Sequence, residues 1–348
     1  MSYQIIIQMI GLYLSDYTFS SALPDSFNIT GVQGEYVEVD VSLEGQSIYS
    51  TKLYKSSNNT CTFYELRQIV EQNMVVRGLT LASLLITVDY GGEADQFSGK
   101  YIIYSKNRKM DSDDEGYLAN HFLMNRTSYT LPRGQMMILP FFATDDEYIR
   151  ARYSCTFLKN GEAVTYQVTQ SIYQYQTPHI YNLYLTADFL QDLAEQSVGD
   201  NCGQLLSFTV RVGDRSLTVY IVDEEPCVHL SFRNSFNTWE EIYVFGSETL
   251  KSEVSRKEAV VMNTSSFYDK TVSRKHEVVT VPLSQEEARW INEFLESDEV
   301  IMEVSHDYPE QPVLISDITS EISDSAKEQV RIKFSWRFDD NSQFLIHN

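Results

Sequence analysis

The residues best placed to do chemistry lie in one stretch, HLSFRNSFNTWEEIYVFG, at positions 229 to 246. It holds a histidine, an arginine beside an asparagine, and the consecutive carboxylates Glu240 and Glu241 among aromatic side chains. Glycoside hydrolysis uses a pair of carboxylates, but the two must lie across a cleft from each other. Because the chain is rich in acidic residues, such pairs also arise by chance. The pair alone therefore does not predict an enzyme.

The same stretch has the pattern of two strands joined by a corner. An Asn-rich turn through Asn234 and Asn237 separates two runs that alternate as strands do. Arg233 has Glu240 and Glu241 close in sequence for ion pairing. We therefore predict a structural corner here rather than an active site.

Other candidates for metal or nucleophilic chemistry are scattered. The six histidines fall outside helical or hairpin reach of one another, whereas zinc sites and catalytic dyads need such proximity or a motif. The four cysteines form no C-x-x-C pair, so buried free thiols are expected. No P-loop, G-x-S-x-G or G-x-G-x-x-G sequence follows a predicted strand. We predict a protein without catalytic residues, metal or cofactor.

One acidic loop partly matches a calcium site. The letters DSDDEG place Asp111, Asp113, Glu115 and Gly116 at the first, third, fifth and sixth positions of an EF-hand loop. The twelfth position falls on Phe122, which offers no carboxylate, and flanking helices are not predicted. A solvated loop is favoured, and irregular calcium binding stays open.

The charge of the chain limits its partners. Its 49 acidic and 27 basic side chains give a formal net charge of -22, which repels nucleic acid and anionic lipid surfaces. The apolar run at 5–14 follows no basic residue and ends at no small-residue cleavage site, so it is expected to be a strand rather than a signal peptide. No segment approaches the roughly 18 apolar residues of a membrane helix. We expect no nucleic-acid or membrane partner.

Strands are predicted to dominate the structure. Alternation of period two runs through 36–43, 151–158, 163–175 and 329–338. Helical patterns are expected near 63–77, 187–197 and 285–297. Thr62 with Glu65 and Ser284 with Glu287 have the spacing of capping boxes, and Thr186 is a good N-cap for the middle helix.

Each predicted helix is followed by strand, turn and strand, at 63–105, 187–223 and 285–318. This recurrence indicates three related units, although common supersecondary motifs also recur by chance. The predicted fold class is mainly β with few short helices, a β-rich α+β arrangement of two or three tandem sandwich or barrel modules, each with one flanking helix. The predicted modules span 1–110, 111–225 and 226–348.

The third module is expected to contain a long hairpin. The letters VSRK occur at 254–257 and again at 272–275, and each copy leads into an acidic residue and a Val-Val pair. Two such strands would put the basic side chains of Arg256, Lys257, Arg274 and Lys275 on one face. Such a face could bind the acidic surface of a neighbouring subunit, or it is an ordinary solvated hairpin.

A Tyr-rich stretch, SIYQYQTPHIYNLYL at 171–185, gives a second candidate surface. Its exposed tyrosines, Tyr173 and Tyr175 above all, could stack on sugars or anchor a protein interface. Tyrosines that merely occupy the wetter side of a strand give the same pattern.

Part of the sequence resembles a known group of proteins. The letters FRNSFNTWEEIYVFG, PLSQEEARWINEFLES, PVLISDITSEISDS and VRIKFSWRF are similar to uncharacterised proteins from the virion and tail modules of Bacteroidetes phages and prophages. The likeness is densest over about 228–340. It implies a virion structural protein, at or near the tail, and implies no catalytic residues.

The preferred hypothesis is a non-enzymatic virion protein that acts as a homo-oligomeric ring or adaptor. Its expected partners are further copies of itself and other virion proteins, and its expected locations are the virion and, during assembly, the host cytoplasm. The main alternative is a carbohydrate-binding or adhesin-like surface module. A glycan-cleaving enzyme is a third, for which the sequence nominates no residue.

Overall fold

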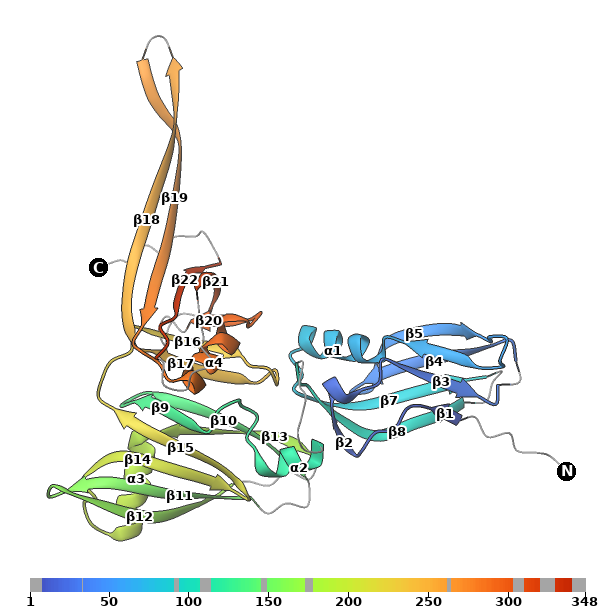
Figure 1. Ribbon diagram of the computed structural model, residues 1–348, viewed down its shortest axis with the longest axis horizontal. Coiled ribbons are helices and arrows are strands. Elements are labelled where there is room, and N and C mark those ends of the chain that lie inside the picture. The colour runs from blue at the N-terminus through green and yellow to red at the C-terminus, as the bar shows by residue number, and fades with distance from the viewer. Residues whose placement is uncertain are drawn as a thin grey trace.

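The computed structural model describes residues 8–32, 34–90, 94–106, 114–144, 149–172, 178–261, 264–302, 310–319 and 329–339. Strands account for 58% of the structure and helices for 15%, so the predicted mainly β class is confirmed. The described chain forms an elongated body from which a hairpin projects to give an L-shaped outline (Figure 1).

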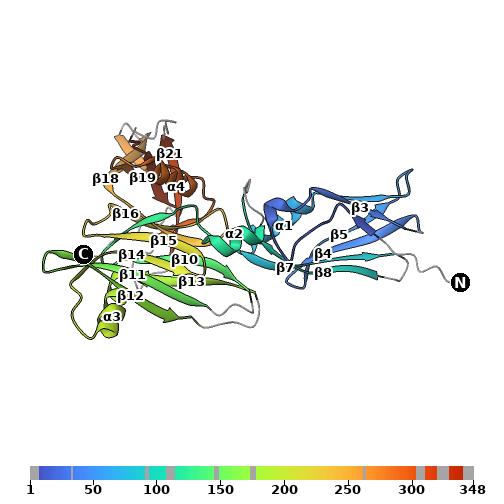
Figure 2. The ribbon, with the colours of Figure 1, turned by 60° about the horizontal axis from the view of Figure 1, so that its bottom comes forward.

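The N-terminal segment is a β-sandwich with one helix beside it (Figures 1 and 2). Its elements are β1 (Gln8–Ile10), β2 (Tyr17–Phe19), a 3-10 turn (Ser20–Ala22), β3 (Ser26–Thr30), β4 (Tyr36–Leu43), β5 (Gln46–Tyr54), β6 (Cys61–Tyr64), α1 (Leu66–Val76), β7 (Leu81–Asp89) and β8 (Ala94–Ile103). A five-stranded sheet in the order β2-β8-β7-β4-β5 and a three-stranded sheet in the order β1-β3-β6 enclose its core. The alternating buried residues of β4 and β7 supply much of that core.

The middle segment is built in the same way. Its elements are α2 (Asp114–Asn120), β9 (Ser128–Pro132), β10 (Met136–Ala143), β11 (Arg150–Lys159), β12 (Glu162–Ser171), β13 (His179–Thr186), α3 (Ala187–Val198), β14 (Gln204–Val212) and β15 (Arg215–Val222). One sheet has the order β12-β11-β14-β15-β9, and β10 pairs with β13 in the other.

The first two segments share a topology. In each, a hairpin (β4–β5, β11–β12) pairs through its first strand with the strand that follows the helix (β7, β14). That strand pairs with the next (β8, β15), which carries a parallel strand on its far side (β2, β9). The predicted recurrence of helix, strand, turn and strand is thus present, and here it extends to the whole sheet.

The C-terminal segment keeps the recurring unit in a different sheet. Its elements are β16 (Val228–Arg233), β17 (Trp239–Val244), β18 (Gly246–Val261), β19 (Thr264–Thr280), α4 (Gln285–Leu295), β20 (Val300–Met302), β21 (Gln311–Thr319) and β22 (Lys333–Phe338). They form a seven-stranded sheet in the order β17-β16-β20-β21-β22-β19-β18. The unit α4, β20 and β21 is present, but β22 separates it from the hairpin β18–β19.

The middle and C-terminal segments share a hydrophobic core, whereas the N-terminal segment has its own. One cluster lies within the N-terminal segment, from Leu12 to Tyr104. A second runs continuously through the middle and C-terminal segments, so residues on both sides of the predicted boundary at 225 belong to it. A third, small cluster includes Phe19, Phe142 and Phe236, one from each segment. This cluster lies where the three segments meet.

Two of the three predicted helix starts are confirmed and one is wrong. Thr186 accepts a hydrogen bond from the Phe189 amide, and Ser284 with Glu287 forms a capping box. Thr62 instead lies in β6, where it pairs with Asn28, and α1 begins after Glu65, which has a left-handed backbone and makes no side-chain cap. The pairing with β3 extends the strand through the expected cap. Helix α2 was not predicted, because its sequence is acidic and lacks an apolar period.

Candidate assembly interface

A long two-stranded arm leaves the body of the molecule (Figure 1). Strands β18 and β19 pair antiparallel from Gly246 with Thr280 at the root to Val261 with Thr264 near the tip. At about 3.3 Å per residue, β18 is about 50 Å long. This is the hairpin predicted from the repeated VSRK letters, and its existence is confirmed.

The root of the arm is fixed by close packing and by polar contacts. Gly246 has φ +150°, and a Cβ at this position would overlap the carbonyl oxygen of Val279. Glu248 Oε1 accepts a hydrogen bond from Trp336 Nε1 at 3.0 Å and lies 2.9 Å from His276 Nδ1. The rings of His276 and Trp336 stack with centroids 3.9 Å apart. These contacts hold the first residues of the arm against β22.

One face of the arm carries exposed apolar side chains among polar ones. Side chains alternate along a strand, and directly opposed residues share a face. Leu250 and Val254 lie on one face, and the register shift between Lys257 and Glu258 brings Phe267 onto that face as well. These three apolar side chains are 54%, 50% and 63% exposed, respectively. We call Leu250, Val254 and Phe267 the apolar stripe.

The apolar stripe continues a buried surface. At the root, Val278 lies on the same face and belongs to the core shared by the middle and C-terminal segments. Beyond Val279 at the root, the other face is polar where its side chains are described, and Lys251 donates there to Glu277 at 2.6 Å. The face of the sheet that packs on the core at the root is thus the same face that bears the apolar stripe on the projecting arm.

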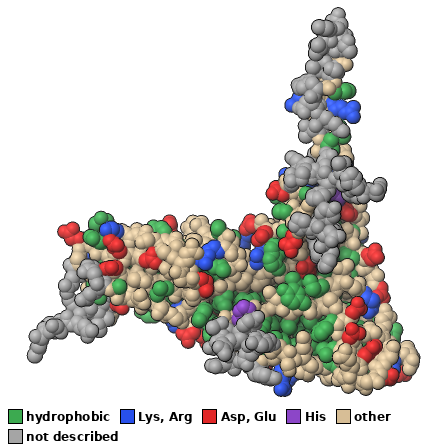
Figure 3. Space-filling model, turned by 180° about the vertical axis from the view of Figure 1, so that it is seen from behind, with side chains coloured by type: hydrophobic (Ala, Val, Ile, Leu, Met, Phe, Trp, Pro, Cys, Tyr) green, Lys and Arg blue, Asp and Glu red, His purple; other side chains and the backbone are tan. Residues whose placement is uncertain are grey.

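The predicted basic residues do not share one face, contrary to expectation. Arg256 and Arg274 lie on the face of the apolar stripe, whereas Lys257 and Lys275 lie on the polar face. The reason is geometric, because neighbouring residues on a strand point to opposite sides. Lys275 forms an ion pair with Asp317 in β21. Lys and Arg side chains accordingly appear on both sides of the arm (Figure 3).

Arg256 adds charge to the apolar stripe. Its guanidinium carbon lies 5.3 Å from the ring centroid of Phe267, within the range of a cation–π contact. Arg274 is also exposed, opposite Ser252. This face therefore combines aliphatic and aromatic side chains with charged groups of both signs, because Glu258 lies opposite Phe267.

The Tyr-rich candidate surface is only partly visible. Tyr173 and Tyr175 lie outside the described residues. Within β13, Tyr181 is buried and stacks on Phe141 at 5.3 Å, while Tyr184 is 59% exposed. Tyr181 of this stretch is thus part of the hydrophobic core and does not contribute to an exposed surface.

The stretch 229–246 is a structural corner, as predicted, and it joins segments far apart in sequence. Asn237 donates through Nδ2 to the carbonyl oxygen of Leu79 at 3.0 Å, and Thr80 Oγ1 donates to the carbonyl oxygen of Asn237 at 2.9 Å. Asn234 donates through Nδ2 to the carbonyl oxygen of Leu123 at 2.8 Å. The corner is therefore bonded to both preceding segments.

The prediction that Arg233 pairs with Glu240 and Glu241 is wrong, because all three side chains have other partners. Arg233 Nε lies 3.2 Å from Glu299 Oε2. Glu240 accepts from Trp290 Nε1 at 2.6 Å, and Glu241 lies 2.6 Å from His229 Nε2. The carboxylates point into the fold because β17 buries them, while Arg233 reaches outward.

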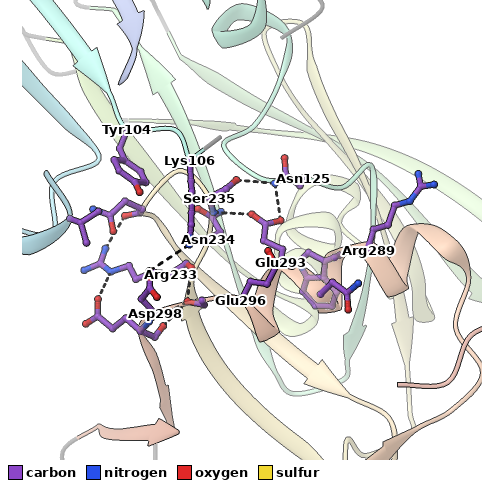
Figure 4. Close-up of a pocket in the computed structure, with 16 residues that line it drawn as sticks. Tyr104, Lys106, Asn125, Arg233, Asn234, Ser235, Arg289, Glu293, Glu296 and Asp298 are labelled. Atoms are coloured by element: carbon purple, nitrogen blue, oxygen red, sulfur yellow. Dashed lines mark hydrogen bonds and ion pairs between the residues drawn. The ribbon is translucent and has the colours of Figure 1, made fainter. Parts of the chain in front are cut away.

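A groove of about 510 Å³ opens beside this corner, and its polar lining is shown in Figure 4. Glu293 accepts hydrogen bonds from the Ser235 amide and from Asn125 Nδ2, both at 2.8 Å. Arg233 points from the opposite side toward Glu299. Glu293 and Arg233 therefore hold elements of the fold together.

The described residues contain no group of three His, Cys, Asp or Glu side chains that could hold a metal ion. Asp111 and Asp113 of the candidate calcium loop lie outside the described part. Cys61, Cys155 and Cys202 are buried free thiols, and burial raises the pKa of Cys155 to about 12. That thiol stays protonated and unreactive at neutral pH. Among the helices described, none is long and apolar enough to cross a membrane.

Comparison with known proteins does not assign the chain to a group. No family model matches it, and no curated protein matches it. A structural neighbour is described as giving "structural insight into host cell surface retention of a 1.5-MDa bacterial ice-binding adhesin". It has 10% sequence identity and a TM-score of 0.17, over 79% of this chain and 92% of the neighbour. A likeness this weak carries no conclusion about fold or function.

Proposed function

We propose that the protein is a non-enzymatic structural subunit of a larger assembly and that the arm docks on a second copy of the chain. The resemblance over 228–340 supports placing this assembly in a phage or prophage virion. There the protein would act as a tail or tail-proximal ring or adaptor component, assembled in the host cytoplasm with other virion proteins.

The observation that carries the proposal is the apolar stripe on the arm. Leu250, Val254 and Phe267 expose half or more of their side chains on one face of a hairpin that stands outside the body. Burying such surface on another protein is favourable, and aromatic and arginine side chains often carry most of the binding energy. A two-stranded arm that carries this stripe is therefore suited to docking.

The choice of a second copy rests on charge. Arg256 and Arg274 place two positive charges beside the apolar stripe, against one negative charge from Glu258 opposite Phe267, while the whole chain has a formal net charge of -22. Another copy offers an abundance of carboxylates to these arginines, which favours encounter and orientation. Strand β18 is also an edge of its sheet, but charged side chains such as Lys251 and Glu253 oppose open-ended edge-to-edge pairing.

The test is to remove the arm without disturbing its root. Because Leu250 pairs directly with His276, residues 251–275 can be replaced by Asn-Gly, a two-residue turn that joins opposed strands. Light scattering of the full chain across a wide concentration range, at low and moderate salt, is expected to give a defined oligomer. The shortened protein is expected to be monomeric and to unfold within about 1 kcal/mol of the full chain, because the ion pairs lost with Lys251 and Lys275 lie at the surface. A full chain that stays monomeric at every concentration contradicts docking on a second copy.

A point variant separates the stripe from the rest of the arm. Phe267→Ser removes its largest side chain and is expected to weaken the oligomer at least about tenfold. Leu314→Ser is the matched control, because Leu314 is an exposed apolar residue on the opposite face of the same sheet. Equal effects of the two substitutions would show that the stripe has no special role.

Glycan binding by a carbohydrate-binding or adhesin-like surface module remains the alternative proposal. It rests on exposed tyrosines of the middle segment such as Tyr184. It predicts a monomer that binds surface polysaccharide and loses binding with Tyr173→Ala or Tyr175→Ala. Retention of polysaccharide binding by both variants would remove this alternative.

A further inference from the structure

The five-stranded sheet of the middle segment has a face that points away from its core. Along β11, buried residues alternate with residues that are partly or fully exposed. Neutral polar side chains, mainly Ser, Thr and Gln, make up most of the exposed face. Its charged side chains in the described part of the chain are Arg150, Arg152 and Arg211, without a carboxylate among them. We call this surface the basic face, although the chain as a whole has a formal net charge of -22.

Two of these arginines form a pair of like charges. Arg152 in β11 lies directly opposite Arg211 in β14, and both are exposed. Like charges placed directly opposite each other on a sheet are destabilising. In the described part of the chain neither arginine forms an ion pair, whereas Lys159 of the same segment pairs with Asp200. A partner that brings carboxylates to this face would offset the repulsion.

The N-terminal segment carries the opposite charge at the corresponding place. Strands β4 and β7 correspond to β11 and β14 in the topology that the two segments share. The third residue of β11 is Arg152, and the third residue of β4 is Glu38, which lies directly opposite Asp89 in β7. Asp40 lies on the same face, where Lys52 offsets one negative charge by pairing with Glu38 at 2.6 Å. We call this exposed surface of the N-terminal sheet the acidic face.

We infer that the basic face of one copy packs against the acidic face of the next. This contact rests on the proposed function, since it adds to the docking made by the arm. The two sheets lie in opposite halves of the elongated body, so the contact is head to tail (Figure 1). A head-to-tail contact closes into a ring where the rotation between copies permits. Because both faces are mainly polar, their charges orient copies that the arm holds together and do not hold them alone.

A second copy fits the basic face in shape as well as in charge. Two sheets of similar twist pack face to face with their strands within about 30° of each other. The row through Arg152 and Arg211 can therefore lie along the row that contains Glu38 and Asp89. Opposite charges then meet across the contact, whereas two basic faces or two acidic faces repel each other. The charges thus favour a head-to-tail contact over a symmetric pairing of identical faces.

The test is an exchange of charge between the two faces, measured on the full chain by sedimentation or light scattering. Arg152→Glu with Arg211→Glu is expected to raise the dissociation constant of the oligomer at least about tenfold at low salt, and less at moderate salt. Glu38→Arg with Asp89→Arg is expected to have the same effect. The variant with all four substitutions is expected to return to within about threefold of the unaltered chain. A misfolded variant cannot give this restoration.

Arg331→Glu with Arg337→Glu is the matched control, because both residues are exposed, lie on neither face and change the net charge equally. This control is expected to leave the dissociation constant unchanged, and an effect equal to that of the basic-face substitutions would overturn the inference. An oligomer that forms in the unaltered chain but is not restored in the fourfold variant would also overturn it, while leaving the docking of the arm intact. A full chain that is monomeric at every concentration would contradict both proposals.

Discussion

Trp290 donates its indole N–H to Glu240 Oε1 at 2.6 Å, deep between α4 and β17. Glu240 is fully buried and also accepts from Asn234 Nδ2 at 3.0 Å. Burial is the main cause that raises the pKa of Glu240 to about 7, with repulsion from Glu293 adding to the rise and Arg126 partly offsetting it. A carboxylate thus sits in the core that joins the middle and C-terminal segments.

This burial predicts a pH-dependent stability. The pKa of Glu240 is about 7 in the folded state against 4.5 as its ordinary value, so between these pH values the folded protein binds more protons than the unfolded chain. Stability from this group is therefore full below the ordinary value and is lost as pH rises toward 7, by about 3 kcal/mol. Glu240→Gln, measured by urea unfolding from pH 5 to pH 8, is expected to lack this loss. Glu253→Gln on the polar face of the arm should keep the wild-type slope.

The corner at Asn237 is expected to hold the N-terminal segment in place. Asn237→Gly keeps the positive φ of this residue, +58°, but leaves the carbonyl oxygens of Leu79 and Met74 without this donor. A loss of about 1–3 kcal/mol in unfolding free energy is expected. Asn237→Ala should lose more, because it adds backbone strain to the same lost bonds. An unchanged stability for the glycine variant would show that the bonds contribute nothing.

Alanine substitutions at Thr186 and Thr62 compare a threonine that caps a helix in the structure with one that has only the sequence pattern of a cap. Thr186→Ala removes the acceptor for the Phe189 amide and should cost about 1 kcal/mol. Thr62→Ala, at the position where the sequence alone predicts a cap, should cost within about 0.5 kcal/mol, since Thr62 lies in a strand and loses only an exposed hydrogen bond from its Oγ1 to Asn28 Oδ1. Thermal or urea unfolding of both variants checks this. A loss at Thr62 as large as that at Thr186 would contradict this difference between the two positions.

The root of the arm should depend on glycine. Gly246→Ala forces a Cβ onto the carbonyl oxygen of Val279 and should destabilise the protein by about 2 kcal/mol or more. Gly45→Ala is the control, because its φ of +72° is also unfavourable for alanine but nothing lies within 4 Å of the added carbon. The difference between the two unfolding free energies measures the steric overlap. Equal losses would mean that the strand shifts without cost.

The sequence predicted those features that depend on neighbouring residues. Ser284 and Glu287 are three positions apart, and their reciprocal hydrogen bonds need nothing else. The two VSRK copies likewise predict a hairpin, because each lies in a segment whose apolar and polar residues alternate. The prediction that Arg256 and Lys257 share a face is wrong, because alternation puts neighbouring residues of a strand on opposite faces.

Features that depend on distant residues were not predictable. Thr62 has the spacing of a cap, but its pairing with Asn28 continues the strand. Nothing near Asn237 in sequence indicates Leu79 as its partner. The bulge that brings Phe267 beside Val254 is a property of the paired strands, and Arg152 was not singled out because it meets Arg211 only in the fold.

The geometry of the arm also determines how its two strands respond to mechanical force. A force that draws the tips of β18 and β19 apart breaks their backbone hydrogen bonds one pair at a time, which needs little force at any moment. A force along the strands loads many of those bonds together, so the same arm resists sliding far better than peeling. The stacked rings of His276 and Trp336 lie at the root of the arm, where the two strands join the seven-stranded sheet. The paired strands of the arm are thus expected to resist a force that slides one along the other better than a force that peels them apart.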